Sequence, residues 1–391
     1  MDMDDLAVIQ NRRDLIRKEL ICAGGLFLSA GRVWSGISRT KHGPLSRPGY
    51  SNKPGRFSKV AMYQVQTSKG VRCMICPNEC NVLADAAGDC GNRKNFGGKL
   101  YSIAYGNPCS VHIDPVEKKP LLHFYPETLA FSIATAGCNL ACLNCQNWTI
   151  SQTTPDKTRN EDLMPEKVVA EALKNQCKSI AYTYSEPITF YEYTFDTSRL
   201  ARSKGIRNIL VSNGFIHEEP LRELATNLDA ANINLKSFSE DIYMRLNSGK
   251  LETVLRTLKV LKEMNVWLEI TNLIIPGWTD DLVMFRKMCE WLCTNGFADN
   301  PLHLLRFHPE YRLTQVPATP LATLDKAREI ARNAGLHYVY IGNVANTPAE
   351  NSYCPQCGKM VVERKGFRTL SLALNMGKCK YCGQTIPGFW S

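Results

Sequence analysis

The sequence predicts an α/β fold: a partial parallel (β/α)6 TIM-like barrel with small N-terminal and C-terminal cysteine-rich metal modules. Two observations predict it. Short apolar runs alternate six times with segments of helical periodicity between residues 129 and 333. Eleven of the 16 cysteines fall into three tight groups, one inside this alternation and one on either side of it.

Six strands and six helices account for the alternation. The strands are expected at Leu129–Thr135, Ser179–Tyr184, Asn208–Ser212, Ala231–Leu235, Trp267–Ile274 and Leu302–Phe307. The helices are expected at Pro165–Gln176, Tyr191–Lys204, Glu219–Thr226, Leu251–Met264, Leu282–Thr294 and Leu321–Asn333. Such units in series imply parallel strands joined by right-handed crossovers. Six units are fewer than the eight that close a barrel, so an open barrel is favoured and a doubly wound sheet is the alternative.

Composition divides the chain into four regions. These are a basic tail and linker (1–60), an N-terminal four-cysteine module (61–125), the barrel (126–345) and a C-terminal module (346–391), which a last strand near Tyr338–Ile341 leads into. In the tail, Arg12-Arg13 precedes the apolar run Ile21–Ala30, which resembles a twin-arginine export signal. We nevertheless expect a cytoplasmic protein with a basic N-terminal tail, and export through a twin-arginine-like signal is the alternative.

Charge and hydropathy exclude two classes of function. The net charge is +10, but residues 1–60 hold eleven basic and five acidic residues, so the remainder is close to neutral and gives no reason to expect nucleic-acid binding. No run of about 18 apolar residues occurs, so no integral membrane span is expected. Cysteines clustered two or three residues apart favour metal ligation over disulfides.

Three cysteines follow the first predicted strand directly, as Cys138-x3-Cys142-x2-Cys145. Three thiolates can bind three corners of a 4Fe–4S cluster and leave the fourth iron without a protein ligand. That iron could chelate S-adenosylmethionine, whose C–S bond would break on one-electron reduction to give a 5′-deoxyadenosyl radical. A structural zinc site is the alternative, but it needs four ligands, and the nearest histidine is His123.

Residues 129–342 resemble the radical S-adenosylmethionine superfamily, specifically the branch related to pyruvate formate-lyase activating enzymes. Several segments are similar to the radical SAM enzyme of the AmmeMemoRadiSam system, and the similarity extends to both outer cysteine modules. These segments are Asp114–Phe124, Cys145–Trp148, Tyr184–Pro187, Asn232–Phe238 and Phe307–Tyr311. The resemblance implies an activating-enzyme-like oxidoreductase that cleaves S-adenosylmethionine into methionine and a 5′-deoxyadenosyl radical. The radical would abstract hydrogen from a substrate, for which a glycyl residue of a partner protein is one candidate.

The resemblance also assigns residues to the cofactor. Glu186 would hold the methionine amino group, and Ser212, Asn213 and Gly214 would contact the ligand's polar groups. Lys236, also a candidate catalytic residue, would reach the cofactor carboxylate. The structural alternatives are a helix N-terminal carboxylate, a simple turn and a solvated lysine.

Three further positions are compared with the family pattern. His308 resembles a histidine near the cofactor carboxylate, with a structural hydrogen bond as the alternative. Asn234 stands where the motif usually has Asp, which puts in doubt any role that requires a negative charge there. Asn144 precedes the third cysteine, where the family usually has an aromatic residue, so a hydrogen bond could replace adenine stacking.

The outer cysteine modules supply four thiolates each. Cys73, Cys76, Cys80 and Cys90 could close a zinc site or saturate an auxiliary iron–sulfur cluster, and the sequence leaves both open. Cys354, Cys357, Cys379 and Cys382 form two Cys-x-x-Cys knuckles with the spacing of a zinc ribbon, so zinc is favoured there.

The partners follow from the expected chemistry. A low-potential electron donor of the flavodoxin or ferredoxin type is required, and the resemblance implies a possible protein substrate and partners of the Memo-like and AMMECR1-like types. The competing function is a multi-cluster iron–sulfur electron-transfer protein without radical chemistry.

Overall fold

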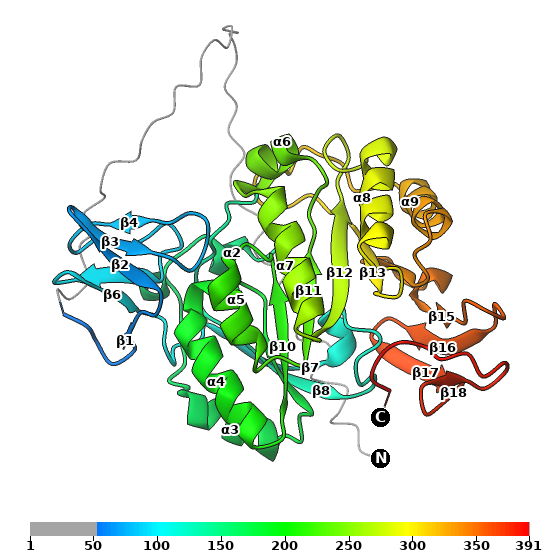
Figure 1. Ribbon diagram of the computed structural model, residues 1–391, viewed down its shortest axis with the longest axis horizontal. Helices are drawn as coiled ribbons and strands as arrows, with labels where there is room; N and C mark the ends of the chain where they lie inside the picture. The colour runs from blue at the N-terminus through cyan, green and yellow to red at the C-terminus, as the bar shows by residue number, and fades with distance from the viewer. Residues whose placement is uncertain (1–52, 391) are drawn as a thin grey trace, which may run out of the picture. The chain divides into compact units, whose positions relative to one another are not determined.

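An eight-stranded sheet forms the centre of this computed structural model, which describes residues 53–390 (Figure 1). The predictions for the tail, including the twin-arginine-like motif, fall outside the described residues. The strand order is β14-β13-β12-β11-β10-β9-β8-β7. The strands are β7 (Ser110–Pro115), β8 (Leu129–Ala134), β9 (Ser179–Tyr182), β10 (Arg207–Ser212), β11 (Ala230–Asn234), β12 (Trp267–Ile274), β13 (Leu302–Arg306) and β14 (Val339–Gly342).

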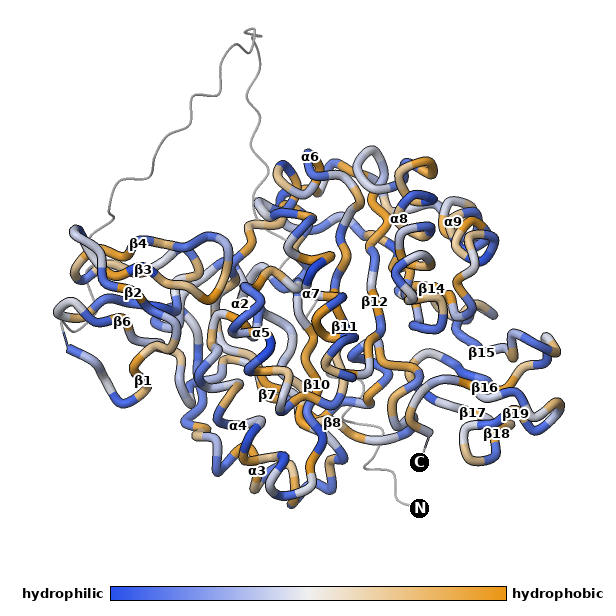
Figure 2. Tube along the Cα trace, viewed as in Figure 1, coloured by the Kyte–Doolittle hydropathy of each residue, from blue (hydrophilic) through white to orange (hydrophobic). Residues whose placement is uncertain are grey.

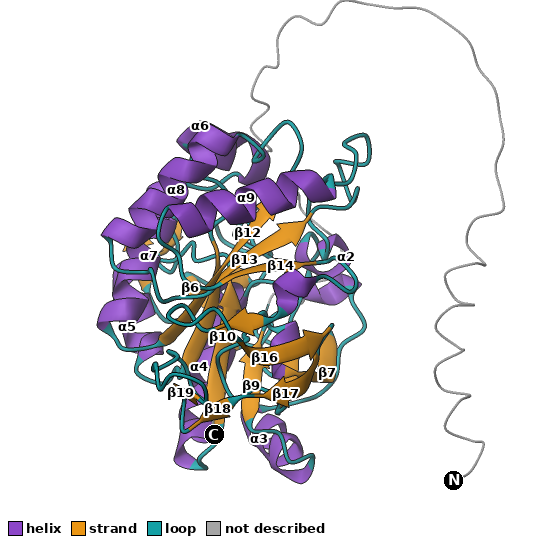
Figure 3. Cartoon of the chain, turned by 90° about the vertical axis from the view of Figure 1, so that its right-hand side faces the viewer, coloured by secondary structure: helices purple, strands orange, loops and turns teal. Residues whose placement is uncertain are grey.

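Six helices connect the seven parallel strands β8 to β14, and all six lie where the periodicity predicts them. They are α3 (Pro165–Lys174), α4 (Tyr191–Ser203), α5 (Glu218–Ala225), α7 (Leu251–Glu263), α8 (Leu282–Thr294) and α9 (Leu321–Asn333). In α7, Val254, Leu258 and Leu261 recur on one face and are fully buried. The Asp281 side chain caps α8 by accepting from the backbone N–H groups of Val283 and Met284. Figure 3 shows these helices gathered on the outer side of the sheet.

Two strands differ from the expectation. The last strand expected near Tyr338–Ile341 is present as β14, but it also pairs in parallel with β13 and extends the main sheet, which was not expected. Strand β7 was not expected and pairs antiparallel with β8. It is an edge strand in which His112 and Ile113 are exposed, and it ends at Pro115, so it lacks the apolar run that marks a buried strand.

Alternation along the strands separates the two faces of the sheet. On β11, Ala231 and Ile233 join the large hydrophobic core under the helices, whereas Asn232 and Asn234 line a cavity. On β13, Leu302 joins the core and His303 lines the cavity. Figure 2 shows apolar stretches along the central strands.

Two small antiparallel sheets precede the main sheet and contain the N-terminal cysteines. Their strands are β1 (Lys59–Val60), β2 (Gln64–Thr67), β3 (Gly70–Cys73), β4 (Asn81–Val82), β5 (Arg93–Phe96) and β6 (Lys99–Ser102), in the orders β1-β6-β5 and β2-β3-β4. Arg93 on β5 and Glu192 on α4 form an ion pair at 2.9 Å with both side chains buried. This pair joins the module to the main sheet.

The C-terminal module packs against the other end of the main sheet. Its strands are β15 (Ser352–Tyr353), β16 (Met360–Lys365), β17 (Arg368–Leu372), β18 (Leu374–Asn375) and β19 (Lys378–Cys379). Val361 and Ile386 share a hydrophobic cluster with Tyr338 and Tyr340 of the β14 segment. Among residues 53–390, none of the helices combines the length and apolar character needed to cross a bilayer.

Candidate active site

A cavity of about 850 Å³ lies at the C-terminal ends of the parallel strands. Its walls contain Cys138, Cys142 and Cys145 from the loop after β8 and polar side chains that follow β9, β10 and β11. The polar residues just beyond the strand ends therefore meet at one site, as the parallel topology requires.

The three-cysteine loop places all three thiols in this cavity. The backbone N–H of Leu140 donates to Cys138 Sγ at 3.4 Å, and Asn247 Nδ2 donates to Cys142 Sγ at 3.2 Å. Burial raises the pKa of the Cys138 thiol well above its usual range. A bound metal would have to displace that proton, and N–H donors directed at sulfur would then stabilise the thiolate. The donor set fits a thiolate-ligated cluster.

Glu186 is a buried carboxylate at the same cavity. Its side chain is 2% exposed and accepts from Ser212 Oγ at 2.7 Å, Asn213 N at 2.8 Å and Ile188 N at 3.2 Å. Burial raises the pKa of Glu186 to about 7, against these three hydrogen bonds that lower it. No ion pair of the described residues 53–390 includes Glu186, so this carboxylate suits a cationic group of a ligand.

The Ser212-Asn213-Gly214 segment connects Glu186 with the cysteine loop. Asn213 Nδ2 lies 3.8 Å from Cys138 Sγ and donates to Asn139 Oδ1 at 2.9 Å. Gly214 has φ +70°, which permits the turn after β10, but it does not line the cavity. Ser212 and Asn213 do line it.

The other predicted site residues differ in position. Lys236 is half-buried and lines the cavity, and its charge acts on both Glu186 and Cys145. Asn144 also lines the cavity and is 8% exposed, with Oδ1 unpaired. His308 is exposed, lies outside the cavity wall, and its Nε2 is 3.4 Å from the carbonyl oxygen of Asn343.

A buried polar network at the far wall of the cavity was not expected from the sequence. Glu269 on β12 is fully buried and lies 2.6 Å from His303 Nε2. It also accepts from the backbone N–H groups of Leu122 and His123. His303 stacks on Tyr340, and both line the cavity. In the sequence, the only signal for this network is the presence of polar residues inside otherwise apolar strands.

The C-terminal module contributes a wall of its own. Arg364, Gly366 and Phe367 line the cavity. Arg364 is 3% exposed and donates to Leu122 O, Ser352 Oγ and Glu350 O at 2.9, 2.8 and 3.1 Å. The part of the cavity wall that these residues form therefore depends on this module for its shape.

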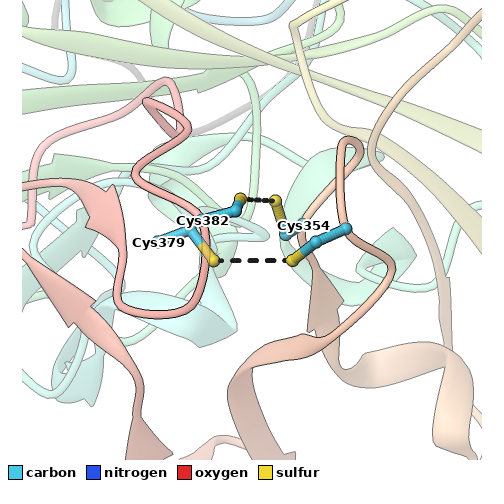
Figure 4. A group of neighbouring side chains, drawn as sticks. Cys354, Cys379 and Cys382 are labelled. Atoms are coloured by element: carbon cyan, nitrogen blue, oxygen red, sulfur yellow. Dashed lines mark hydrogen bonds between the residues drawn. The ribbon is translucent and has the colours of Figure 1, made fainter.

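The C-terminal cysteines form a compact group of four thiols (Figure 4). Their sulfur atoms lie within 4.8 Å of one another, with Cys354 to Cys382 at 3.5 Å and Cys357 to Cys379 at 3.8 Å. Four thiolates around one ion at tetrahedral angles and 2.3 Å bonds would stand about 3.8 Å apart. This group can bind a single metal ion.

Comparisons with known proteins relate the chain to one family. The family model described as Radical SAM superfamily matches residues 132–289. The protein MJ0808 of Methanocaldococcus jannaschii, itself described as uncharacterized, is 44% identical over 330 residues, which are 84% of this chain and 98% of that protein. The pyruvate formate-lyase 1-activating enzyme of Escherichia coli K12 is 27% identical over 213 residues, 51% of this chain and 87% of the relative. A solved domain of the pyruvate-formate lyase-activating enzyme from Bacteroides vulgatus covers 42% of this chain and 99% of its own, at 18% identity and a TM-score of 0.37.

Proposed function

Because the chain belongs to the radical SAM superfamily, in the branch related to pyruvate formate-lyase activating enzymes, we propose that it is an oxidoreductase that uses S-adenosylmethionine to abstract hydrogen from a second substrate. A 4Fe–4S cluster held by Cys138, Cys142 and Cys145 would supply the one-electron cleavage of the cofactor. The eight-stranded sheet would act as an open, partial barrel that presents these residues.

One observation carries the proposal most directly. Glu186, a buried carboxylate that forms no ion pair among the described residues, faces the same cavity as the three thiols, and Asn213 contacts both Glu186 and Cys138. A ligand with a cationic amino group beside a metal-binding atom could pair with this carboxylate and also reach a metal held by the thiols. Glu186 would hold the amino group of S-adenosylmethionine, and Lys236 would neutralise the carboxylate of the same cofactor.

The chain's own residues would also define the second substrate's position. The barrel (126–345) would hold the cofactor, and the C-terminal module (346–391) would shape the rest of the cavity through Arg364 and Phe367. The proposed N-terminal four-cysteine module comprises residues 61–125. A glycyl residue of a partner protein is the activating-enzyme-like candidate substrate. A flavodoxin- or ferredoxin-type donor would supply the electron, and Memo-like and AMMECR1-like proteins are the proposed partners.

The test is product formation after anaerobic reconstitution with iron and sulfide. With dithionite and S-adenosylmethionine, the protein should form 5′-deoxyadenosine and methionine, measured by liquid chromatography and mass spectrometry. Deuterated candidate substrates would then identify the abstracted hydrogen by label in 5′-deoxyadenosine. A multi-cluster electron-transfer protein, the second candidate function, would form no 5′-deoxyadenosine and would retain reducible clusters.

Cofactor binding should weaken on the acid side of neutrality. With the pKa of Glu186 raised to about 7 by burial, the carboxylate is ionised in about three quarters of molecules at pH 7.5 and about a tenth at pH 6.0. Since only the ionised form attracts the amino group, affinity should fall about eightfold between these pH values. Titration calorimetry of the reconstituted, oxidised protein with S-adenosylmethionine would measure it.

The matched control is Glu186→Gln, which keeps the shape and removes the titration. This variant should bind weakly at both pH values, with the acid-side dependence abolished. A variant that retained the eightfold change would assign the effect to another group.

A further inference from the structure

The four N-terminal cysteines surround a small cavity of their own, separate from the active-site cavity. Its wall contains Cys73, Cys76, Cys80 and Cys90 together with neighbouring residues of the module and of the main sheet. Cys73 is buried and the other three thiols are partly buried. The four thiols thus converge on one enclosed space although they come from segments that span 18 residues of sequence.

The spacing of these thiols differs from that of the C-terminal group. Within residues 53–390, the C-terminal cysteines are the one group of at least three potential metal ligands whose ligand atoms all lie within 4.8 Å of one another. No three of the N-terminal thiols therefore lie within 4.8 Å of one another, whereas one tetrahedral zinc ion requires all of its thiolates to stand about 3.8 Å apart. A cubane holds its cysteines on irons at different corners, so it needs the wider spacing.

The backbone around the cysteines also differs between the N-terminal and C-terminal modules. In the C-terminal module, Gly358 and Gly383 follow the second cysteine of each pair, with φ of +70° and +81°. The backbone N–H of each glycine donates to the carbonyl oxygen of the first cysteine of its pair, Cys354 or Cys379, at 2.9 Å. The N-terminal module has one Cys-x-x-Cys pair, followed by two separated single cysteines and no second knuckle. Paired knuckles are typical of single-ion zinc sites.

We propose that Cys73, Cys76, Cys80 and Cys90 hold a second iron–sulfur cluster with four irons, rather than a zinc ion. Four cysteine ligands leave no iron open to S-adenosylmethionine, so this site would only accept and release single electrons. A reduced flavodoxin- or ferredoxin-type protein would supply each electron, and no bond or proton would change at the site.

The position of the module suits an electron carrier. Asn78 Nδ2 donates to Asn139 O at 2.8 Å, and Asn139 lines the N-terminal cavity while its side chain contacts Asn213 of the active site. Gly137, at φ +100°, packs so closely that a Cβ there would collide with the carbonyl oxygen of Cys90. The backbone that carries the four thiols is therefore in direct contact with the loop that carries Cys138.

Metal analysis of a variant that lacks the other cluster site tests the proposal. In Cys138→Ala/Cys142→Ala/Cys145→Ala, any remaining cluster must use other cysteines. After anaerobic reconstitution we expect about four irons and four sulfides per chain, with about one zinc. Dithionite should produce a paramagnetic signal that S-adenosylmethionine does not alter. Fewer than about two irons together with about two zinc ions per chain would overturn the proposal.

Two further variants assign the iron and control for folding. Adding Cys76→Ala and Cys80→Ala should remove the remaining iron while the C-terminal zinc stays near one per chain, which reports a folded protein. Adding Cys293→Ser instead, on α8, should leave the iron unchanged; iron retained without Cys76 and Cys80 would contradict the assignment. Since the iron count does not require turnover, failure to form 5′-deoxyadenosine would refute the proposed function without deciding this one.

Discussion

Cys142→Ala should reduce 5′-deoxyadenosine formation by more than about 10³-fold, the scale seen when an essential catalytic group is removed. Cys142 is 8% exposed, and its sulfur accepts from Asn247 Nδ2 at 3.2 Å. Alanine offers no ligand atom, and no other thiol among residues 53–390 lines the active-site cavity apart from Cys138 and Cys145. Two thiolates cannot hold a cubane as three do.

The measurement is product formation per chain under dithionite, with metal content determined on the same sample. Iron should fall, whereas the C-terminal metal should remain, because its four ligands are separate from the loop. Cys293→Ser is the matched control and should form product at the wild-type rate. Product at that rate from Cys142→Ala would contradict the assignment of the three-cysteine loop.

The regular part of the fold could be predicted because each element carries a local signal. Trp267–Ile274 and Leu282–Thr294 match the observed strand and helix at both ends, since an apolar run and the cap at Asp281 mark them. Strand β7 lacks such a signal because it is a partly exposed edge strand without an apolar run, and its pairing with β8 is a tertiary contact. The parallel pairing of β14 is equally non-local.

The site was predictable where the chemistry lies in one short segment. The spacing of Cys138, Cys142 and Cys145 indicated a shared ligand, and the thiols do line one cavity. Glu269 and His303 are 34 residues apart, and their hydrogen bond exists only because β12 and β13 are neighbours. Sequence spacing also does not give the distances between thiols: the C-terminal four lie within 4.8 Å of one another, and the N-terminal four do not.

Removing the C-terminal metal should unfold its module without abolishing cofactor cleavage. In Cys379→Ala, the proposed zinc should be lost and amide hydrogen exchange across residues 352–390 should accelerate by more than about 100-fold. A structural zinc contributes about 10–16 kcal/mol to the folding of small zinc-finger peptides. The module's own apolar cluster is small and includes Cys354 and Cys379 themselves, so it cannot replace that contribution.

The effect should be confined because the module and the cofactor residues lie on different segments. The cavity wall formed by Arg364 and Phe367 would be lost, but the three cysteines and Glu186 belong to the main sheet and its loops. Dithionite-driven 5′-deoxyadenosine formation should therefore persist in Cys379→Ala, whereas coupling to the second substrate should fail. Lys380→Ala, which changes an exposed side chain next to Cys379, is the control and should retain the metal. If exchange stayed slow after the metal was lost, packing against Tyr338 and Tyr340 alone would be sufficient to hold the module.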